Sequence, residues 1–586
     1  MDDKDYLDKL RHSAAHLLAA AVMELYPEAK RTIGPAIENG FYFDFDFGDI
    51  KISEDDLLKI ETKMHGILKS WDGFERHELS TEEAKNEYPE NHYKHELIEE
   101  FAGAGQALTF YKSGDYWDLC RGGHVENPKE ELIHFKLLSV AGAYWRGDEK
   151  NSMLTRIYGT AWPSQKELED YLHNLEEAKR RDHRKLGQEL ELFTISPQVG
   201  PGLILWLPKG VVLREEIEKL GKETEAQYGY QRVATPHIGK EELYITSGHL
   251  PYYASDMWPP MEYEGEKYYV KPMNCPHMHM IYKFKPRSYR ELPIRFAEFG
   301  TVYRHEDSGT LMGLLRVRGH TTNDAHIYCL EEQVVGEMVN VMEMHSYYYE
   351  LFGIKDYYIE LALPDFEKKK DKYFGDPRDW EKAIKLLRTA AKESKVEVVE
   401  KEGGAAFYGP KFDFNIKSAI GREFGASTNQ LDFGSGTRFK LAYIGHHGGE
   451  KTIPYVIHRA PLGSEERFIG FLIEHYGGAF PVWLSPVQVK VLPITERNIE
   501  YSNEVIKRLK DEDIRAELDD RAETLNNKIR RAQEEKVPYM LILGDKEKES
   551  ESLSLRLRNG ESKNDIKIES FIRDIREKIE KRSLEL

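Results

Sequence analysis

The sequence contains little cysteine, no long apolar run and no recognisable targeting segment. Its three cysteines (Cys120, Cys275 and Cys329) are too few and too scattered for a disulfide framework, which favours a reducing cytoplasm. No run of about 18 apolar residues occurs, so we expect no membrane span. The N-terminal MDDKDYLDKL is acidic and has neither an apolar signal core nor an Arg-rich transit pattern.

Basic residues are also in deficit. The chain has 83 Lys and Arg against 102 Asp and Glu, a formal net charge of −19. This net charge argues against a protein coated in nucleic acid. It does not exclude a local basic groove, because nucleic-acid binding depends on patches of positive charge rather than on the net charge of the whole chain. With 40% hydrophobic and 32% charged residues the composition is globular, and 586 residues are too many for one core. We therefore expect several domains.

Changes of pattern along the chain predict four parts. Residues 1–160 alternate helical stretches with short strand-like runs, including FYFDFDF within residues 40–47. Residues 161–192 are charged and rich in helix formers, which predicts a solvated connecting helix. Residues 193–484 mix strands with helices and hold most of the unusual polar clusters. In residues 485–586, VQVKVLPI and PYMLILGD are separated by a helical pattern, which predicts a small α/β domain.

Three arginine-bearing segments lie in the third part. EFGTVYRHED predicts a strand that places Arg304 and Glu306 on one face, since they are two residues apart. The loop SGTLMGLLRVRGH then carries Arg316 and Arg318, and GSEERFIGFLIEHYGG predicts a helix with Arg467 near its start. A lone arginine is usually a surface ion pair. A set of them suits a polyphosphate, because each guanidinium donates two hydrogen bonds to neighbouring oxygens and keeps its charge.

Cysteine and histidine cluster in two regions. KPMNCPHMHMIY brings Cys275, His277 and His279 close together, which by itself favours a local metal site. The N-terminal part contains HSAAH and DLCRGGH, and an HxxxH pair carries little weight alone in a chain with 22 histidines. Two His, a Cys and a His are also the ligand types of a structural zinc site, so that alternative stays open.

The ordered motifs resemble those of class II aminoacyl-tRNA synthetases. QRVATPHI, with Pro236, resembles their motif 1, YRHED their motif 2 and GSEERFIGF their motif 3. KPMNCPHMHMIY, RVRGHTTNDAHIYC, GGAAFYGPKFDF and IPYVIHRAPLGSEERF narrow the resemblance to the threonyl-tRNA synthetase family, and it extends from HSAAH to the C-terminal part. It implies an α+β multidomain fold: an α+β editing domain at 1–160, a linker helix at 161–192, an antiparallel-sheet class II catalytic domain at 193–484 and an α/β anticodon-binding domain at 485–586.

The resemblance also implies an activity and its partners. We expect activation of L-threonine with ATP and magnesium to threonyl-adenylate, transfer to the 3′ end of tRNA(Thr), and hydrolysis of mischarged Ser-tRNA(Thr). A homodimer through motif 1, a cytoplasmic location and no membrane partner are expected too. For zinc, the resemblance implies one ion per subunit in the catalytic domain, on Cys275, His326 and His458 rather than on the local cluster.

The remaining site residues are implied by matching positions. For ATP they are Arg304 at the α-phosphate, Glu306 at the adenine end, and Arg316 and Arg467 at the γ-phosphate. For threonine they are Asp324, Tyr408, Lys411 and Gln430. For editing they are His12, His16, Lys94, Asp118, Cys120 and His124. For the anticodon they are Arg530, Glu547 and Arg556.

The substrate explains why two sites are needed. Threonine and valine have nearly the same shape, and an apolar pocket separates such isosteres only about a hundredfold. A zinc ion that bonds the amino group and the hydroxyl rejects valine, which has no hydroxyl. Serine has one and passes, so a second, hydrolytic site is expected on physical grounds.

The sequence departs from the family pattern in places. We expect a form lacking the small N-terminal ubiquitin-like domain with which members usually begin. A pocket Cys of many bacterial members corresponds to Ala426, and an Asn of the anticodon region to Ala522. Three alternatives remain: a prolyl- or seryl-specific class II enzyme, a catalytically silent synthetase-like protein that binds tRNA, and a free-standing zinc hydrolase.

Overall fold

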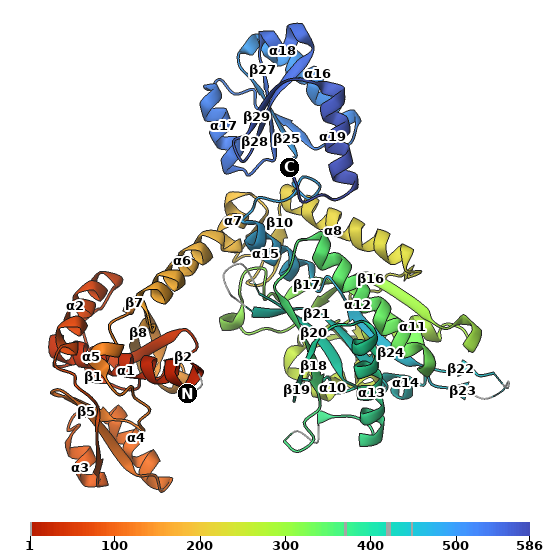
Figure 1. Ribbon diagram of the computed structural model, residues 1–586. Coiled ribbons are helices and arrows are strands. Elements are labelled where there is room, and N and C mark those ends of the chain that lie inside the picture. Colours follow the sequence, from red (N-terminus) through yellow and green to blue (C-terminus); the bar gives the residue numbers. More distant parts are fainter. Residues whose placement is uncertain (1–2, 369–371, 418–422, 447–448, 450) are drawn as a thin grey trace. The chain divides into compact units, whose positions relative to one another are not determined.

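The computed structural model describes residues 3–368, 372–417, 423–446, 449 and 451–586. The chain forms two compact units, Met1–Glu176 and Glu177–Leu586 (Figure 1). None of the helices in the described ranges combines the length and apolarity that crossing a bilayer requires.

The first unit is built on an antiparallel sheet of order β1-β3-β8-β7, with β2 paired to β3. Its strands are β1 (Lys30–Arg31), β2 (Ala36–Ile37), β3 (Gly40–Asp46), β7 (Phe135–Tyr144) and β8 (Met153–Ala161). The predicted alternating strand is β3, whose Phe41, Phe43 and Phe45 are buried against α1 (Asp3–Leu25) and α2 (Leu57–Leu68). Because successive side chains of a strand point to opposite faces, the alternating phenylalanines of β3 determine which face of this sheet packs against the core.

A second, three-stranded sheet completes this unit. It has the order β4-β5-β6 and consists of β4 (Glu75–Leu79), β5 (Leu108–Ser113) and β6 (Tyr116–Leu119). The remaining helices are α3 (Thr81–Asn86), α4 (His92–Gly103) and α5 (Pro128–Glu131). Asp118 lies on β6 and Lys94 lies on α4, so this sheet and helix supply two of the predicted editing residues.

The single connecting helix expected over residues 161–192 is instead two helices, α6 (Gln165–Arg181) and α7 (His183–Glu189). Asp182 separates them: its backbone is non-helical, and its side chain accepts a hydrogen bond from the Arg184 N–H, which caps α7. Composition predicted helix here, but it did not reveal the break, because Asp182 resembles any other surface charge in the sequence.

The second unit contains an eight-stranded sheet of order β11-β16-β17-β24-β21-β20-β18-β19. Its strands are β11 (Gln231–Arg232), β16 (Ile294–Tyr303), β17 (Gly319–Cys329), β18 (Tyr357–Leu363), β19 (Val398–Glu402), β20 (Lys411–Lys417), β21 (Glu423–Asp432) and β24 (Tyr455–Ala460). Only the edge strands β11 and β19 pair in parallel; every other pair is antiparallel. The antiparallel catalytic sheet is confirmed.

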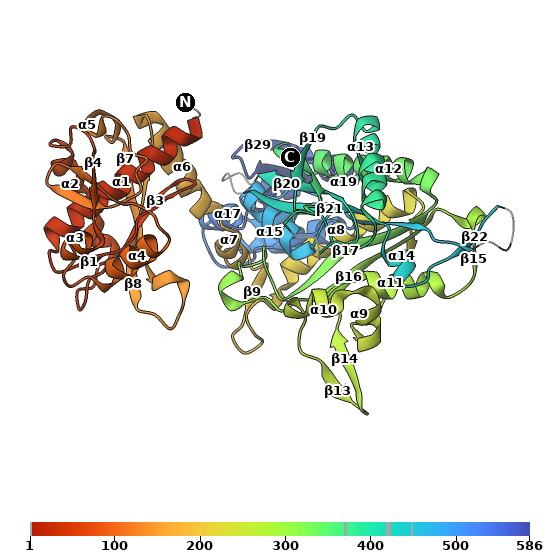
Figure 2. The ribbon, with the colours of Figure 1, turned by 90° about the horizontal axis from the view of Figure 1, so that it is seen from below.

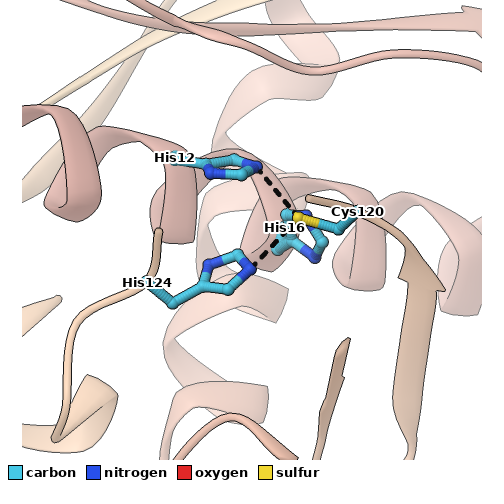
Figure 3. Close-up of side chains that lie close together, drawn as sticks. All are labelled: His12, His16, Cys120 and His124. Atoms are coloured by element: carbon cyan, nitrogen blue, oxygen red, sulfur yellow. Dashed lines mark hydrogen bonds between the residues drawn. The ribbon is translucent and has the colours of Figure 1, made fainter. Parts of the chain in front are cut away.

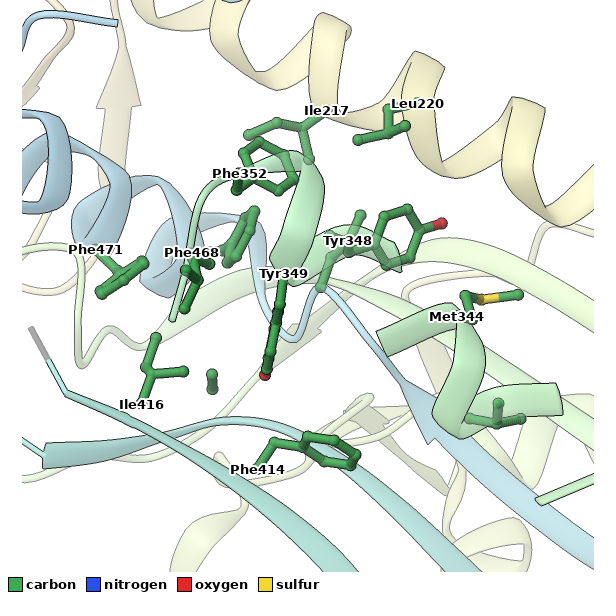
Figure 4. Close-up of a cluster of buried hydrophobic side chains, with 14 of the residues drawn as sticks. Ile217, Leu220, Met344, Tyr348, Tyr349, Phe352, Phe414, Ile416, Phe468 and Phe471 are labelled. Carbon is green, nitrogen blue, oxygen red and sulfur yellow. The ribbon is translucent and has the colours of Figure 1, made fainter. Parts of the chain in front are cut away.

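The core of this unit lies between one face of the sheet and its helices. These are α8 (Pro208–Gln227), α12 (Val334–Leu351), α13 (Pro377–Glu393) and α15 (Glu465–Tyr476). Figure 4 shows Tyr349 of α12 and Phe468 of α15 packed over Phe414 and Ile416 of β20. Because strand side chains alternate between faces, Lys411, Asp413 and Asn415 of the same strand point to the opposite face, away from the helices.

Smaller elements surround the sheet. They are β9 (Phe193–Ile195), β10 (Ile204–Trp206), β12 (Ile238–Lys240), α9 (Glu241–Ser247), α10 (His249–Tyr252), β13 (Met261–Tyr263), β14 (Glu266–Val270), α11 (Cys275–Lys283), β15 (Arg287–Ser288), α14 (Ser435–Arg438), β22 (Tyr443–Ile444) and β23 (Lys451–Thr452). Figure 2 shows the β13–β14 hairpin extending away from the main sheet. The predicted strand EFGTVYRHED ends at Tyr303, so Arg304 and Glu306 lie beyond β16 rather than on it.

The C-terminal part holds a mixed sheet of order β26-β25-β27-β28-β29. The strands are β25 (Val489–Pro493), β26 (Ala516–Leu518), β27 (Tyr539–Leu543), β28 (Ser552–Leu557) and β29 (Ser562–Lys567). Helices α16 (Ile499–Asp511) and α19 (Ile568–Glu580) cover one face, and α17 (Leu525–Glu534) covers the other. The short helix α18 (Asp545–Ser550) packs beside β28. This confirms the α/β prediction for the C-terminal part.

Candidate functional site

A pocket of about 550 Å³ opens on the face of the eight-stranded sheet that the core helices leave uncovered. In β17, Ala325 and Ile327 belong to the core under the helices, whereas Thr322 and Asp324 line the pocket. Ten predicted residues line it: Cys275, Arg304, Glu306, Arg316, Asp324, Tyr408, Lys411, Gln430, His458 and Arg467. The fold therefore assembles the predicted ATP and threonine residues from segments up to about 190 residues apart.

Arg304 and Arg316 lie on the loop that joins β16 to β17 (residues 304–318, the arginine-bearing loop), and Arg467 contacts this loop from α15. Arg467 donates from Nε to the Leu315 carbonyl at 3.1 Å and from Nη1 to the Gly425 carbonyl at 3.0 Å. Arg316 pairs with Glu306, with 2.8 Å between Nε and Oε2. Burial lowers the pKa of Arg467, and the charges of Arg304 and Arg316 lower it further. Arg467 thus lies among like charges, and Glu306 supplies one negative charge that offsets them.

Cys275 and His458 line this pocket, and the buried His326 lies beside them. Cys275 begins α11, and His326 and His458 lie directly opposite each other on the neighbouring strands β17 and β24, with ring centroids 4.5 Å apart. One ligand atom from each lies within 4.8 Å of the others. Both ring nitrogens of the fully buried His326 lack a hydrogen-bond partner within the described part of the chain. A buried imidazole with no partner fits metal ligation, and one Cys with two His is a donor set suited to zinc.

Asp432 fixes the orientation of His458. Its Oδ2 lies 2.9 Å from Nε2 of the imidazole, and its Oδ1 accepts hydrogen bonds from the Gly434 and Ser435 backbone N–H groups, each at 2.8 Å. Burial alone would raise the pKa of Asp432, but the bonds from His458 and Ser435 hold it below its usual value. A carboxylate behind a ligand histidine sets the tautomer and the ring direction.

The local cluster suggested by CPHMH does not assemble. Nδ1 of His279 lies 3.0 Å from the Tyr328 hydroxyl, and Nε2 of His277 lies 3.4 Å from the Ile238 carbonyl. Neither belongs to the group formed by Cys275. The hypothesis of a metal site made from neighbours in sequence is therefore wrong, because ring nitrogens of His277 and His279 contact the Ile238 carbonyl and the Tyr328 hydroxyl instead.

The predicted threonine residues lie beside this Cys/His group. Asp324 accepts a hydrogen bond from the Asn274 amide at 3.1 Å, and burial raises its pKa to about 6. The Tyr408 hydroxyl donates to Gln430, and the Tyr408 ring stacks on His458 at 5.2 Å. Lys411 pairs with Asp413 at 2.5 Å. The pocket thus presents hydroxyl, amide and carboxylate groups beside Cys275 and His458.

The first unit has a pocket of its own, of about 630 Å³. His12 and His16 lie one turn apart on α1, and Cys120 follows β6 (Figure 3). The Cys120 sulfur lies 3.4 Å from Nε2 of His12 and 3.3 Å from Nε2 of His124. One ligand atom from each of these four side chains lies within 4.8 Å of the rest, so the arrangement is compatible with both a metal-free and a metal-bound site.

Burial sets the protonation states in this second pocket. It lowers the pKa of His12, lowers that of His16 to about 3, and raises that of the Cys120 thiol to about 12. Without a metal, both imidazoles and the thiol are therefore uncharged at neutral pH. A thiolate nucleophile is not available under those conditions.

Asp118 stands at the centre of a buried polar network beside these histidines. Its Oδ1 lies 2.8 Å from Nζ of Lys94 and 3.2 Å from Nε of Arg31. Tyr88 donates to the same oxygen at 2.5 Å, and Tyr116 donates to Oδ2 at 3.0 Å. Burial alone would raise the pKa of Asp118, but Lys94 and Arg31 hold it far below its usual value.

Three members of this network were missed in the sequence. Arg31, Tyr88 and Tyr116 come from different elements and belong to no motif. Arg31 also stacks over the rings of Tyr88 and Tyr116, at 5.1 and 5.3 Å. Two cations around one carboxylate leave the network with a net positive charge, which suits a site where an ester oxygen becomes negative.

Three segments of the chain match models of known protein families. Residues 108–158 match the model of the threonyl and alanyl tRNA synthetase second additional domain, residues 260–476 that of the tRNA synthetase class II core domain (G, H, P, S and T), and residues 488–578 that of an anticodon binding domain. A threonine–tRNA ligase of Sulfurihydrogenibium is 48% identical over 580 residues, which cover 98% of this chain and 89% of that protein. The chain belongs to the threonine–tRNA ligase family.

Further relatives support the same family. The threonine–tRNA ligase of Thermus thermophilus is 47% identical over 599 aligned positions, covering 100% of this chain and 90% of that protein. The RNA binding domain of a threonyl-tRNA synthetase from Cryptosporidium parvum superposes with a TM-score of 0.65 at 34% identity, covering 68% of this chain and 98% of that one. A prolyl-tRNA synthetase of the same organism has a TM-score of 0.53 at 19% identity, which shows a shared fold alone.

Family membership decides between the alternatives. The chain is a threonine–tRNA ligase with a class II core, an anticodon-binding domain and the second additional domain associated with editing. A free-standing zinc hydrolase is wrong, because it would leave the class II core unexplained. The expected enzyme class and fold are confirmed.

The predicted anticodon residues lie in the C-terminal sheet and its helices. Arg556 lies opposite Met540 on β27, so it points to the face that α17 covers, and α17 carries Arg530. Glu547 is buried, and both of its oxygens serve the fold: Oε2 accepts the Gly544 N–H at 2.9 Å and Oε1 accepts the Ser554 hydroxyl at 2.8 Å. Of the three, the two arginines are the more accessible to a partner.

Proposed function

We propose that the two pockets divide the work of this ligase, with synthesis of threonyl-tRNA in the second unit and hydrolysis of mischarged Ser-tRNA in the first. One observation carries the proposal: the three arginines line one pocket together with Cys275 and His458, and the buried His326 completes the Cys/His/His group. A polyphosphate and a small amino acid need such neighbouring groups in order to react with each other.

In the synthetic site, Arg304 binds the α-phosphate of ATP, and Arg316 and Arg467 bind the γ-phosphate together with magnesium. Glu306 faces the adenine. The threonine carboxylate attacks the α-phosphorus, a new P–O bond forms, and pyrophosphate leaves. Negative charge moves onto phosphate oxygens during this step, and guanidinium groups that are already fixed stabilise it without reorganisation. Arg467 is fixed in this way by the Leu315 and Gly425 carbonyls.

Cys275, His326 and His458 would hold one zinc ion per subunit. When bound, it supplies a Lewis acid with open positions for the amino group and the hydroxyl of threonine. Asp324 and Tyr408 orient these two groups, and Lys411 and Gln430 complete the pocket. Valine lacks the hydroxyl that this site is built to bind, so it leaves polar groups unpaired and is rejected.

In the editing site, His12, His16, Cys120 and His124 position water at the ester carbonyl of Ser-tRNA. The Lys94 ammonium, held by Asp118, lies close enough to the pocket to stabilise the oxyanion that forms. The uncharged histidines can accept a proton from water. A structural zinc on the same four side chains is the competing arrangement, and its donor atoms are equally close.

The remaining assignments belong to the same proposal. Residues 1–160 form the editing domain, 161–192 the linker, 193–484 the catalytic domain and 485–586 the anticodon-binding domain, with Arg530, Glu547 and Arg556 at the anticodon. The chain forms a homodimer through the motif 1 region around Pro236 and works in the cytoplasm. Three unpaired cysteines support that location.

A substrate comparison tests the proposal. Threonine should drive rapid ATP–pyrophosphate exchange, serine should drive it weakly, and valine and proline should not drive it. Separately, the full chain should hydrolyse supplied Ser-tRNA(Thr) faster than Thr-tRNA(Thr). Exchange driven equally well by valine would contradict the threonine pocket, and absence of Ser-tRNA hydrolysis would contradict the editing assignment.

A further inference from the structure

We propose that His183 is a positioning residue for ATP, acting through the arginine-bearing loop. His183 is the first residue of α7, and its side chain is 1% exposed. It does not line the ATP pocket. Its effect would therefore reach the substrate through the backbone that it holds, and the inference rests on the ATP site proposed above.

Both nitrogens of the His183 ring have partners. The Leu314 backbone N–H donates to Nε2 at 3.0 Å, and Nδ1 lies 2.8 Å from Oε1 of Glu474 on α15. A backbone N–H can only donate, so Nε2 must be unprotonated and the proton must lie on Nδ1, which donates to Glu474. Leu314 and Glu474 are both buried, so no water competes for these bonds. The ring is thus held in one tautomer between α15 and the loop.

These bonds also argue against a metal at this place. Asp182, His183 and Glu474 have donor atoms within 4.8 Å of one another. A metal needs a free lone pair on the imidazole, but the lone pair on Nε2 is used by the Leu314 N–H, and Nδ1 carries its proton toward Glu474. The group is better explained as a hydrogen-bonded clamp.

Two glycines allow the ring to come this close. Gly313 has φ +52°, and a Cβ there would lie 2.3 Å from Nε2 of His183. A Cβ on Gly470 of α15 would lie 3.0 Å from Cβ of Leu314 and 3.6 Å from Cδ2 of His183. The loop, the ring and α15 therefore fit together only because side chains are missing at these two positions.

The clamp acts on the residues next to those proposed to bind ATP. His183 holds Leu314, Arg467 holds the Leu315 carbonyl at 3.1 Å, and Glu306 holds Arg316 at 2.8 Å. Three consecutive residues are thus fixed by three different partners. If Leu314 shifts, Arg316 and the Leu315 carbonyl that accepts from Arg467 shift with it. Small misplacements of phosphate-binding groups strongly reduce the rate of the reaction.

Two substitutions separate the halves of the clamp. His183→Asn keeps an amide near the position of Nδ1, so it can still donate to Glu474, but it is too short to accept from Leu314. His183→Gln reaches the position of Nε2, and its carbonyl can accept the Leu314 N–H. We expect His183→Asn to raise KM for ATP about tenfold in threonine-dependent exchange, the effect of one lost buried hydrogen bond, while KM for threonine stays unchanged. His183→Gln should restore most of the ATP affinity.

The matched control is His173→Asn on α6, where the side chain is exposed. Thermal unfolding of each variant is measured alongside. A lower Tm for His183→Asn with unchanged KM for ATP would overturn the inference in favour of a purely structural role, and so would equal losses in the Asn and Gln variants. Arg316→Ala tests the ATP site itself: if it impairs exchange while His183→Asn does not, only this inference fails, and if it leaves KM for ATP unchanged, the proposed site fails.

Discussion

Asp432 and His458 form a buried pair, with Oδ2 of the carboxylate 2.9 Å from Nε2 of the imidazole. The other oxygen of Asp432 is occupied by two backbone N–H groups. The carboxylate therefore keeps the proton of His458 on Nε2, which leaves Nδ1, with its lone pair, as the nitrogen able to bind a metal. A residue that contacts neither substrate nor metal thus decides whether the ring can act as a ligand.

The first prediction concerns that pair. In Asp432→Asn the new carbonyl can still accept the Gly434 and Ser435 N–H groups, so the amide nitrogen must face His458. It donates to Nε2 and forces the proton onto Nδ1. Zinc affinity should fall about 10- to 100-fold. Competition with a chelating dye measures it, with Asp574→Asn on the exposed face of α19 as control. Unchanged zinc retention in Asp432→Asn would show that His458 is not a ligand.

The second prediction concerns phosphate binding. Arg467→Lys keeps the positive charge, but one ammonium cannot reach the Leu315 and Gly425 carbonyls and a phosphate together. We expect kcat/KM for ATP to fall about 10²- to 10³-fold in pyrophosphate exchange, the usual effect of losing one fixed donor to a developing charge. Arg388→Lys on α13, where Arg388 forms an exposed pair with Glu400 of β19, should behave as the wild type. A similar loss in both variants would indicate a general effect of the substitution.

The third prediction concerns pH. Glu466 is buried and accepts the Thr321 N–H at 2.9 Å, and burial raises its pKa to about 6 from a usual 4.5. A raised pKa means that the folded state holds the proton more tightly, so stability falls as the pH rises from about 4.5 through 6. Glu466→Gln keeps the acceptor and removes the charge. At neutral pH it should be more stable by about 2 kcal/mol.

Thermal unfolding at about pH 5 and pH 7.5 measures this difference. The Tm of Glu466→Gln should exceed that of the wild type by a few degrees at the higher pH, and the gap should shrink at the lower one. Glu215→Gln, at an exposed position of α8, is the control and should show no pH-dependent gap. A gap that grows on acidification would contradict the assigned direction.

The elements that sequence reasoning found are those that repeat a local pattern. FYFDFDF alternates because one face of β3 is buried, and the helix at Arg467 begins where the Ser464 side chain caps it. The ends of elements were less predictable. EFGTVYRHED continues the apolar pattern of β16 for only a few residues, and no residue near Tyr303 marks the end of the strand.

The site was predictable only where a motif or the family resemblance marked it. Cys275, His326 and His458 are 51 and 132 residues apart in succession, and their contact arises from strand pairing that no local pattern reveals. Asp432, Arg31 and His183 act through hydrogen bonds to other residues rather than through a motif. Such partners are determined by tertiary packing, so they become visible only in the folded chain.

The fourth prediction concerns tRNA. Arg556 lies on the face of the C-terminal sheet beneath α17, and Arg573 lies on α19, across the opposite face. Arg556→Ala should raise KM for tRNA about tenfold in aminoacylation, as expected for loss of one base contact, while threonine-dependent exchange stays near normal. Arg573→Ala is the matched control and should charge normally. Loss of charging and exchange together would indicate misfolding rather than lost recognition.

The last prediction separates the two active sites. Replacing His12 and His16 together with Ala should leave threonine activation intact and let Ser-tRNA(Thr) accumulate, because their pocket is built from residues of the first unit only. Replacing Cys275 with Ala should do the reverse: activation is lost, and supplied Ser-tRNA(Thr) is still hydrolysed. If the His12/His16 variant lost activation as well, the two pockets would not be independent.

A chelator then decides how the editing pocket works. His12, His16, Cys120 and His124 are close enough to hold a metal, yet without one the thiol and both α1 histidines are uncharged at neutral pH. We expect Ser-tRNA(Thr) hydrolysis by the full chain to survive a strong chelator that abolishes threonine activation. Elemental analysis of the untreated protein should find about one zinc per chain, because only Cys275, His326 and His458 would bind it. Hydrolysis that disappears with the chelator, together with a second zinc, would keep the editing assignment but replace the metal-free mechanism with one that depends on these four ligands.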